Sequence, residues 1–231
     1  PRLLEAASDE LGPIEHKACT GAVTADLFRP QKGQPAQIPI TPMSDVGLVT
    51  ISIGGNDVEF AGIVQACYLA TTTCVGTDND ENFNAKLTTL SDYLVGTVYP
   101  ALAAAYPNAR IVHVGYPKLI PPEGDTPVHC GWLGPDEQWT AERLNEKLNG
   151  AITNAIERQS RVEFLDVADI LEDHELCTWN SWMHPINVAV YGLFATEQGH
   201  PTAMGQLAYR DRVARELGIS LKGASGGGGG W

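Results

Sequence analysis

The sequence predicts an α/β fold in which helices cover both faces of a parallel β-sheet. Three apolar segments rich in β-branched residues, at 46–53, 109–117 and 161–171, are typical of strands buried on both faces of such a sheet. Segments with helical periodicity separate them, and this alternation of strand and helix favours parallel over antiparallel order. At 231 residues the chain is long enough for one large domain of this class.

The helices are predicted from apolar residues that repeat every three or four positions. One such stripe consists of Leu87, Leu90, Leu94, Val98 and Leu102, and another of Leu144, Leu148, Ile152 and Ile156. A final helix is expected from about residue 202 to 217, and a short one over residues 2–11, ended by Gly12 and Pro13. Residues 58–70 are interpreted as helical or irregular.

Composition excludes several classes of partner. The formal net charge is −13 and the isoelectric point is about 4.7, which argues against nucleic acid, because binding there depends on basic residues that neutralise phosphates. No apolar run approaches the length needed to cross a bilayer, so no transmembrane segment is expected. One domain is expected over residues 1–222. The glycine-rich residues 223–231 have no pattern that could pack.

The five cysteines suggest two disulfides. Cys67 and Cys74 bracket a short loop, and Cys130 and Cys177 lie in two loops that could meet. A rival interpretation takes Cys130 and Cys177 with His129 and His174 as zinc ligands, but adjacent residues such as His129 and Cys130 are poorly placed to face one metal. Cys19 is left over, as a free thiol or a cysteine whose partner is missing.

The first predicted strand ends on an unusual turn, Gly54-Gly55-Asn56-Asp57. A simple turn explains the glycines but not Asn56. In parallel sheets ligands bind beyond the carboxyl ends of the strands, where the Asn56 amide could donate a hydrogen bond to a developing oxyanion. The backbone N–H of Gly21, in a loop of small residues, could be a second donor.

A candidate general base lies near the other end of the chain. His200 precedes Pro201 at the start of the last predicted helix, a position that is often merely structural. Glu197, three residues upstream, is close enough in a tight turn to accept a proton from the imidazole and fix its tautomer. A histidine oriented in this way can activate a nucleophile.

These three stretches together resemble the SGNH (GDSL-type) hydrolase family of esterases and lipases. Gly21 in "ACTGAVT" matches the family's second block, "GGND" the third, and "EQGHP" the fifth, with Glu197 in place of an aspartate. The resemblance implies a three-layer α/β/α, flavodoxin-like fold, with Gly21 and Asn56 as the oxyanion hole and Gly54, Gly55 and Asp57 as the supporting turn. His200 and Glu197 would be catalytic, and no metal or cofactor is needed.

The resemblance looks closest to secreted actinobacterial members with several disulfides, so an extracellular location is expected. The family's first block, Gly-Asp-Ser, is absent from the chain. The first strand and the nucleophilic serine are therefore expected upstream of residue 1, together with a partner for Cys19. Ser52, within the strand at 46–53, is interpreted as a core hydroxyl instead.

The predicted function is hydrolysis of a carboxylic ester by serine acyl transfer. Short-chain esters, lipid esters and acetylated polysaccharides all remain open as substrates, and the sequence does not indicate the oligomeric state. Four tryptophans of the later loops could line a substrate pocket or simply pack: Trp132, Trp139, Trp179 and Trp182. The alternative function is a catalytically inactive protein that binds lipid or carbohydrate on the same scaffold.

Overall fold

A computed structural model describes residues 12–69, 74–123, 130, 133–186 and 199–221. Its sheet contains strands β1 (Leu48–Ile51), β2 (Arg110–Val114) and β3 (Val162–Leu165), in the order β1-β2-β3. Both pairs are parallel, with Val49 opposite Ile111 and Ile111 opposite Val162. The predicted parallel sheet is confirmed. The hydrogen-bonded strands are shorter than the apolar segments, because residues such as 52–57 and 115–117 leave the ladder as loops at its carboxyl end.

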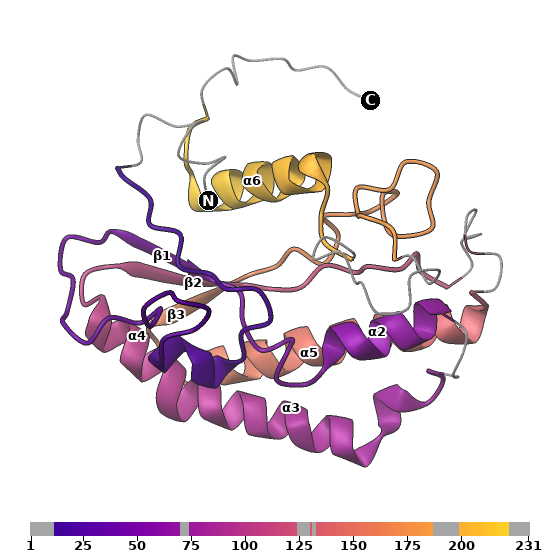
Figure 1. The fold of residues 1–231 in the computed structure, drawn as a ribbon, viewed down its shortest axis with the longest axis horizontal. Helices are drawn as coiled ribbons and strands as arrows, with labels where there is room; N and C mark the ends of the chain where they lie inside the picture. The colour runs from indigo at the N-terminus through magenta and orange to yellow at the C-terminus, as the bar shows by residue number, and fades with distance from the viewer. Residues whose placement is uncertain (1–11, 70–73, 124–129, 131–132, 187–198, 222–231) are drawn as a thin grey trace.

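Helices cover both faces of this sheet (Figure 1). Helix α6 (Ala203–Leu217) lies on one face, and the other carries α2 (Phe60–Leu69), α3 (Glu81–Tyr93), α4 (Tyr99–Ala105) and α5 (Pro135–Glu157). Two short 3₁₀ helices, η1 (Thr24–Phe28) and η2 (Thr77–Asn79), lie in the connections. This arrangement is the three-layer α/β/α fold that the resemblance implied. Among the described residues, no helix is long and apolar enough to cross a membrane.

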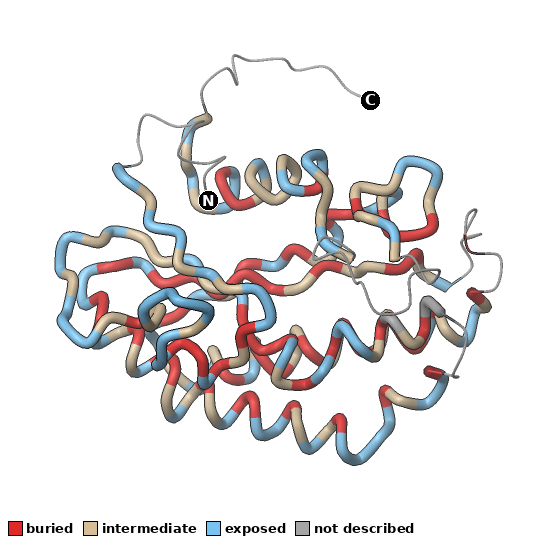
Figure 2. The backbone as a smooth tube through the Cα atoms, viewed as in Figure 1, coloured by how far each residue is buried: buried red, intermediate tan, exposed pale blue. Residues whose placement is uncertain are grey.

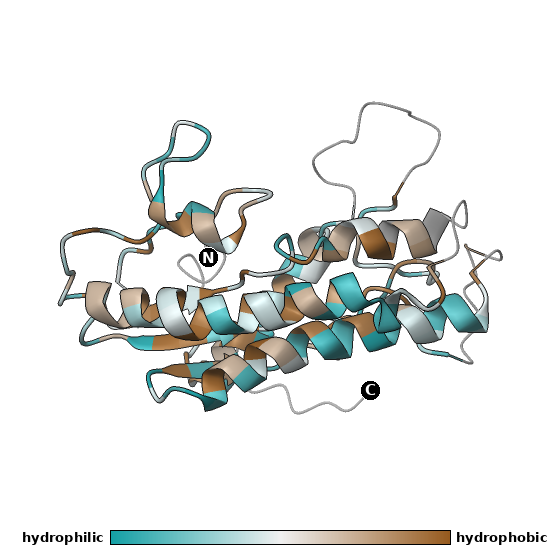
Figure 3. Ribbon diagram, turned by 90° about the horizontal axis from the view of Figure 1, so that it is seen from below, coloured by the Kyte–Doolittle hydropathy of each residue, from teal (hydrophilic) through white to brown (hydrophobic). Residues whose placement is uncertain are grey.

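The predicted apolar stripes face the core. Buried residues follow the strands and the inner sides of the helices (Figure 2), and the α3–α5 layer shows hydrophilic and hydrophobic residues in alternation (Figure 3). The stripe from Leu87 to Leu102 is buried, but it is not one α-helix. A π-helical turn, Leu94–Val98, separates α3 from α4, and the Tyr99 N–H bonds the Leu94 carbonyl five residues back. Pro100, which has no N–H to donate, explains the break in the α-helical ladder at this point.

Two disulfides form, Cys67–Cys74 and Cys130–Cys177, as the sequence suggested. All four cysteines are buried. The second disulfide removes the zinc interpretation, because the thiolates that a metal would need are joined to each other. Cys19 is a half-buried free thiol.

Some expectations lie outside the described residues: the helix at 2–11, the tail at 223–231, and the side chains of His129 and Trp132. One interpretation is wrong. Ser52 is exposed, as is Thr50 two residues earlier on the same face, so this face of β1 is not buried as a core strand would be.

A neutral histidine is buried in the core. His113 of β2 is fully buried, and its Nδ1 lies 3.0 Å from the hydroxyl of Tyr99 on α4. Burial lowers the pKa of His113 to about 4, although the backbone of Ile53 acts in the opposite direction. Because the folded pKa is depressed, the unfolded chain binds more protons below about pH 6.5, and folding stability falls as the pH falls from there toward 4.

We therefore expect His113 to make the fold sensitive to mild acid. Its contribution to the free energy of unfolding falls by about 2 kcal/mol between pH 7 and pH 5. Urea unfolding at both pH values should show this loss in the wild type and a smaller one in His113→Gln, which cannot titrate. Equal losses in the two proteins would contradict the assignment.

Candidate active site

The turn after β1 requires glycine. Gly54 has a positive φ of 112°, and a Cβ there would lie 2.9 Å from a methyl group of Leu90 on α3. The Asp57 N–H closes the turn on the Gly54 carbonyl at 3.1 Å. As a result the chain reverses within four residues, and the exposed side chain of Asn56 stands at the carboxyl end of the sheet.

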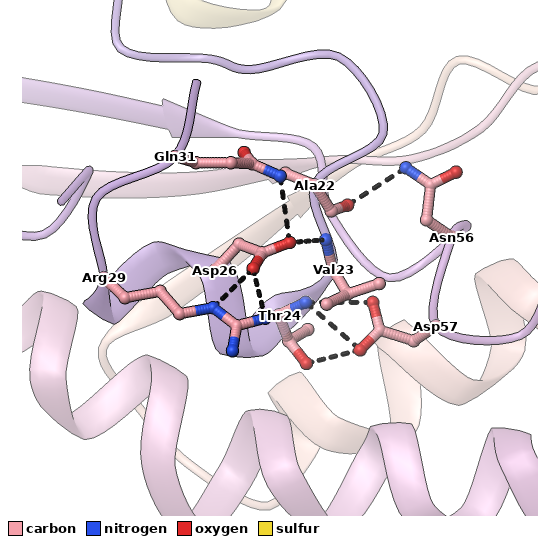
Figure 4. A network of polar contacts seen from close by, with 8 residues as sticks. All are labelled: Ala22, Val23, Thr24, Asp26, Arg29, Gln31, Asn56 and Asp57. Atoms are coloured by element: carbon pink, nitrogen blue, oxygen red, sulfur yellow. Dashed lines mark hydrogen bonds and ion pairs between the residues drawn. The ribbon is translucent and has the colours of Figure 1, made fainter. Parts of the chain in front are cut away.

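The loop that contains Gly21 docks on this turn. Gly21 has a positive φ of 77° and is exposed. The Asn56 Nδ2 donates to the carbonyl of Ala22, the next residue, at 3.0 Å (Figure 4). A side-chain amide has two hydrogens, so this bond uses one and leaves the other for a ligand. The structure thus brings the two predicted oxyanion donors into neighbouring positions.

Asp57 makes the strongest connection between the two segments. Its two carboxylate oxygens accept the Thr24 backbone N–H at 3.1 and 3.0 Å, and one also accepts the Thr24 hydroxyl at 2.5 Å (Figure 4). Thr24 is buried, so these bonds are shielded from water. Hydrogen bonds to an ionised acceptor are roughly twice as strong as neutral ones. Asp57 therefore supports the site by holding the Gly21 loop against the turn.

A second carboxylate, which the sequence did not single out, stiffens the same loop. Asp26 is buried and accepts the Val23 N–H at 3.0 Å, the Arg29 Nε at 2.7 Å and the Gln31 Nε2 at 3.1 Å (Figure 4). The Val23 N–H and then Arg29 lower the pKa of Asp26. The sequence could have indicated this role, because Asp26 is an acidic residue at the third position of a short helix, η1, where it can bond the N–H of the residue before the helix.

His200 comes from a different part of the fold, the loop that leads into α6. Its carbonyl accepts the His184 N–H at 2.9 Å, and the Gly199 N–H bonds the His184 carbonyl at 3.1 Å. Thr202 then caps α6 by accepting the Gly205 N–H at 3.4 Å. His200 is exposed, and the end of α6 that follows it lies on the side where the strands end (Figure 1). Glu197 lies outside the described residues.

The structure describes three of the four tryptophans that were predicted to line a pocket or to pack. Trp182 stacks on His174 with ring centroids 3.6 Å apart, whereas Trp179 and Trp139 are exposed. A groove of about 440 Å³ lies between Thr24, Asp57 and the exposed side of α3. Within the part of the chain that the structure describes, no cluster of three or more His, Cys, Asp or Glu residues could hold a metal ion.

Comparisons with known proteins identify the family to which this fold is related. Residues 1–208 match the model of the GDSL-like lipase/acylhydrolase family. Lipase 1 of Streptomyces coelicolor is 31% identical over 210 residues, which cover 88% of this chain and 69% of that protein. A lipase of Streptomyces rimosus is 29% identical over 218 residues, with the same shares covered.

Two solved structures have a similar fold. The extracellular lipase of Streptomyces rimosus superposes with a TM-score of 0.60 at 25% identity, covering 86% of this chain and 78% of that one. Phospholipase A1 of Streptomyces albidoflavus NA297 gives the same TM-score and identity, covering 85% and 77%.

We expect the Asp57 bonds to contribute measurably to stability. Asp57→Asn keeps the shape but removes the charge, and should cost about 2 kcal/mol in the free energy of unfolding. Asp92→Asn is the matched control, because Asp92 forms an exposed ion pair with Arg158 at 2.8 Å, and such pairs contribute less than about 1 kcal/mol. Equal losses in urea unfolding would show that Asp57 does not hold the two segments together.

Proposed function

Because the chain belongs to the GDSL-like lipase/acylhydrolase family, an ester-hydrolase family, we propose that it cleaves carboxylic esters by serine acyl transfer. In this proposal Asn56 and the Gly21 N–H form the oxyanion hole, and His200 is the general base. The observation that supports it most strongly is the 3.0 Å bond from Asn56 Nδ2 to Ala22, next to Gly21. That bond keeps both donors at one edge of the sheet.

The reaction would proceed in two steps. A serine hydroxyl attacks the ester carbonyl while His200 takes its proton, and the carbonyl oxygen becomes an oxyanion that Asn56 and Gly21 stabilise. His200 then returns the proton to the leaving alkoxide. Water then attacks the acyl-enzyme. His200 takes a proton from this water and returns it to the serine oxygen, which releases the acid. Glu197 is the proposed partner that orients the imidazole.

The nucleophile is proposed to lie on the amino-terminal side of Pro1. No serine of the chain stands in the Gly-Asp-Ser context of the family. Strand β1 is at one edge of the described sheet, with three of its four residues half-buried. A further parallel strand pairing with this edge would end beside the Gly54 turn, because parallel strands end at the same edge of a sheet.

The substrate class and location follow from the relatives and the cysteines. The similar proteins are lipases and a phospholipase A1, so we propose a lipid ester as substrate. Two buried disulfides fit an oxidising compartment, and one similar structure is of an extracellular lipase, so we propose that the protein is secreted.

The test is reaction of the complete gene product with a serine-directed phosphonate ester, followed by peptide mapping and an ester-hydrolysis assay. We expect one labelled serine on the amino-terminal side of Pro1, and a loss of labelling rate of roughly 10²-fold or more in His200→Asn. His16→Asn replaces an exposed histidine and should label normally. Absence of label in folded protein would favour the alternative function of lipid or carbohydrate binding without catalysis.

A further inference from the structure

We propose that Tyr116 is a positioning residue for Asn56, and this inference depends on the proposed role of Asn56 as an oxyanion donor. Tyr116 follows β2, and its hydroxyl accepts the Gly55 N–H at 2.9 Å. Gly55 immediately precedes Asn56. The bond therefore fixes the backbone from which the Asn56 side chain projects.

The Tyr116 ring also packs tightly against the turn. A Cβ on Gly55 would lie 2.9 Å from a ring carbon of Tyr116, so only glycine lets the ring approach this closely. The ring of Phe60, the first residue of α2, lies at a centroid distance of 6.0 Å and is tilted by 55°. Such tilted aromatic contacts are favourable. Tyr116 thus contacts both the turn, at Gly55, and the start of α2, at Phe60.

The backbone of Tyr116 is itself held from α5. Asn149 accepts the Tyr116 N–H at 2.8 Å and donates to the Tyr116 carbonyl at 2.8 Å. Asn145, one helical turn earlier, donates to the same carbonyl at 3.1 Å. Gly115 permits this approach, because a Cβ there would lie 2.9 Å from the Asn149 side-chain oxygen. Both backbone polar groups of Tyr116 are therefore satisfied by two asparagines on one face of α5.

The surroundings keep the Tyr116 hydroxyl neutral. Burial is the largest effect and raises the pKa of Tyr116, while the Gly55 N–H and the Ser52 hydroxyl lower it and Asp57 raises it. A protonated phenol can accept the Gly55 N–H and still donate its own hydrogen.

This arrangement would preorganise the oxyanion hole. A donor stabilises a developing charge most when it needs no rearrangement during the reaction, and small displacements reduce rates sharply. Tyr116 does not itself face the substrate in this account. Its effect passes through Gly55 to Asn56.

The test is Tyr116→Phe, which removes the acceptor and keeps the ring. In the complete enzyme we expect kcat to fall roughly 10-fold with KM unchanged, a smaller loss than the roughly 10²-fold expected on removing the Asn56 donor itself. In the same protein, we expect the Gly55 amide to exchange with solvent roughly 10-fold faster and the Asn56 Nδ2 NMR signals to shift. Tyr99→Phe is the matched control, because it removes a buried hydroxyl that bonds His113 instead of the turn.

The two measurements separate the inference from the proposed function. Unchanged Gly55 exchange and unchanged Asn56 signals in Tyr116→Phe overturn the inference, as does a kcat within twofold of wild type. Equal effects in Tyr99→Phe overturn it too, because they would reflect general loss of stability. If the wild-type enzyme hydrolyses no ester, the proposed function fails, and the exchange measurement still decides whether Tyr116 holds the turn.

Discussion

The site depends on one interaction, the docking of the Gly21 loop on the Gly54–Asp57 turn. Asp57 accepts both polar hydrogens of Thr24, and Asn56 donates to Ala22. The bonded residue pairs are 33 or 34 residues apart in sequence, and the described residues form no β-ladder between the two segments. Without these bonds the two segments would be free to separate, and the two proposed donors would no longer be held at one edge of the sheet.

The docking of these two segments is a local contact, but the rest of the fold determines where the two segments lie. The parallel sheet sets the position at which β1 ends, and Leu90 of α3 fills the space that a side chain at position 54 would need. Asp26 stiffens the Gly21 loop from its other side. The site therefore depends both on packing, through Leu90 of α3, and on polar bonds within and between the two segments.

Sequence patterns predicted much of this fold, because strand and helix periodicities report burial directly. The apolar segments became β1, β2 and β3, and the leucine stripes became buried helix faces. The π-helical turn before Tyr99 was not predicted. Apolar residues three and four positions apart are compatible both with a regular α-helix and with one that contains an extra residue in a turn. Ser52 was placed in the core because its strand was expected to be buried on both faces, whereas Thr50 and Ser52 are both exposed.

The candidate site was predictable only where residue type carries the chemistry. Asn56, Gly21 and Asp57 stood out through their motif, and the structure places them together. The partnership of Asp57 with Thr24, and of Tyr116 with Gly55, could not be predicted, because pairs 33 and 61 residues apart leave no local signal. His200 was identified by its neighbours in sequence, and Glu197 stays a prediction.

The most direct test of the account is a crystal structure of the complete enzyme after reaction with a phosphonate ester, whose phosphoryl oxygen stands for the oxyanion. We expect this oxygen at about 3 Å from both Asn56 Nδ2 and the Gly21 N. The Asn56 bond to Ala22 should persist in that adduct. A phosphoryl oxygen bound by other donors, with Asn56 and Gly21 facing solvent, would contradict it.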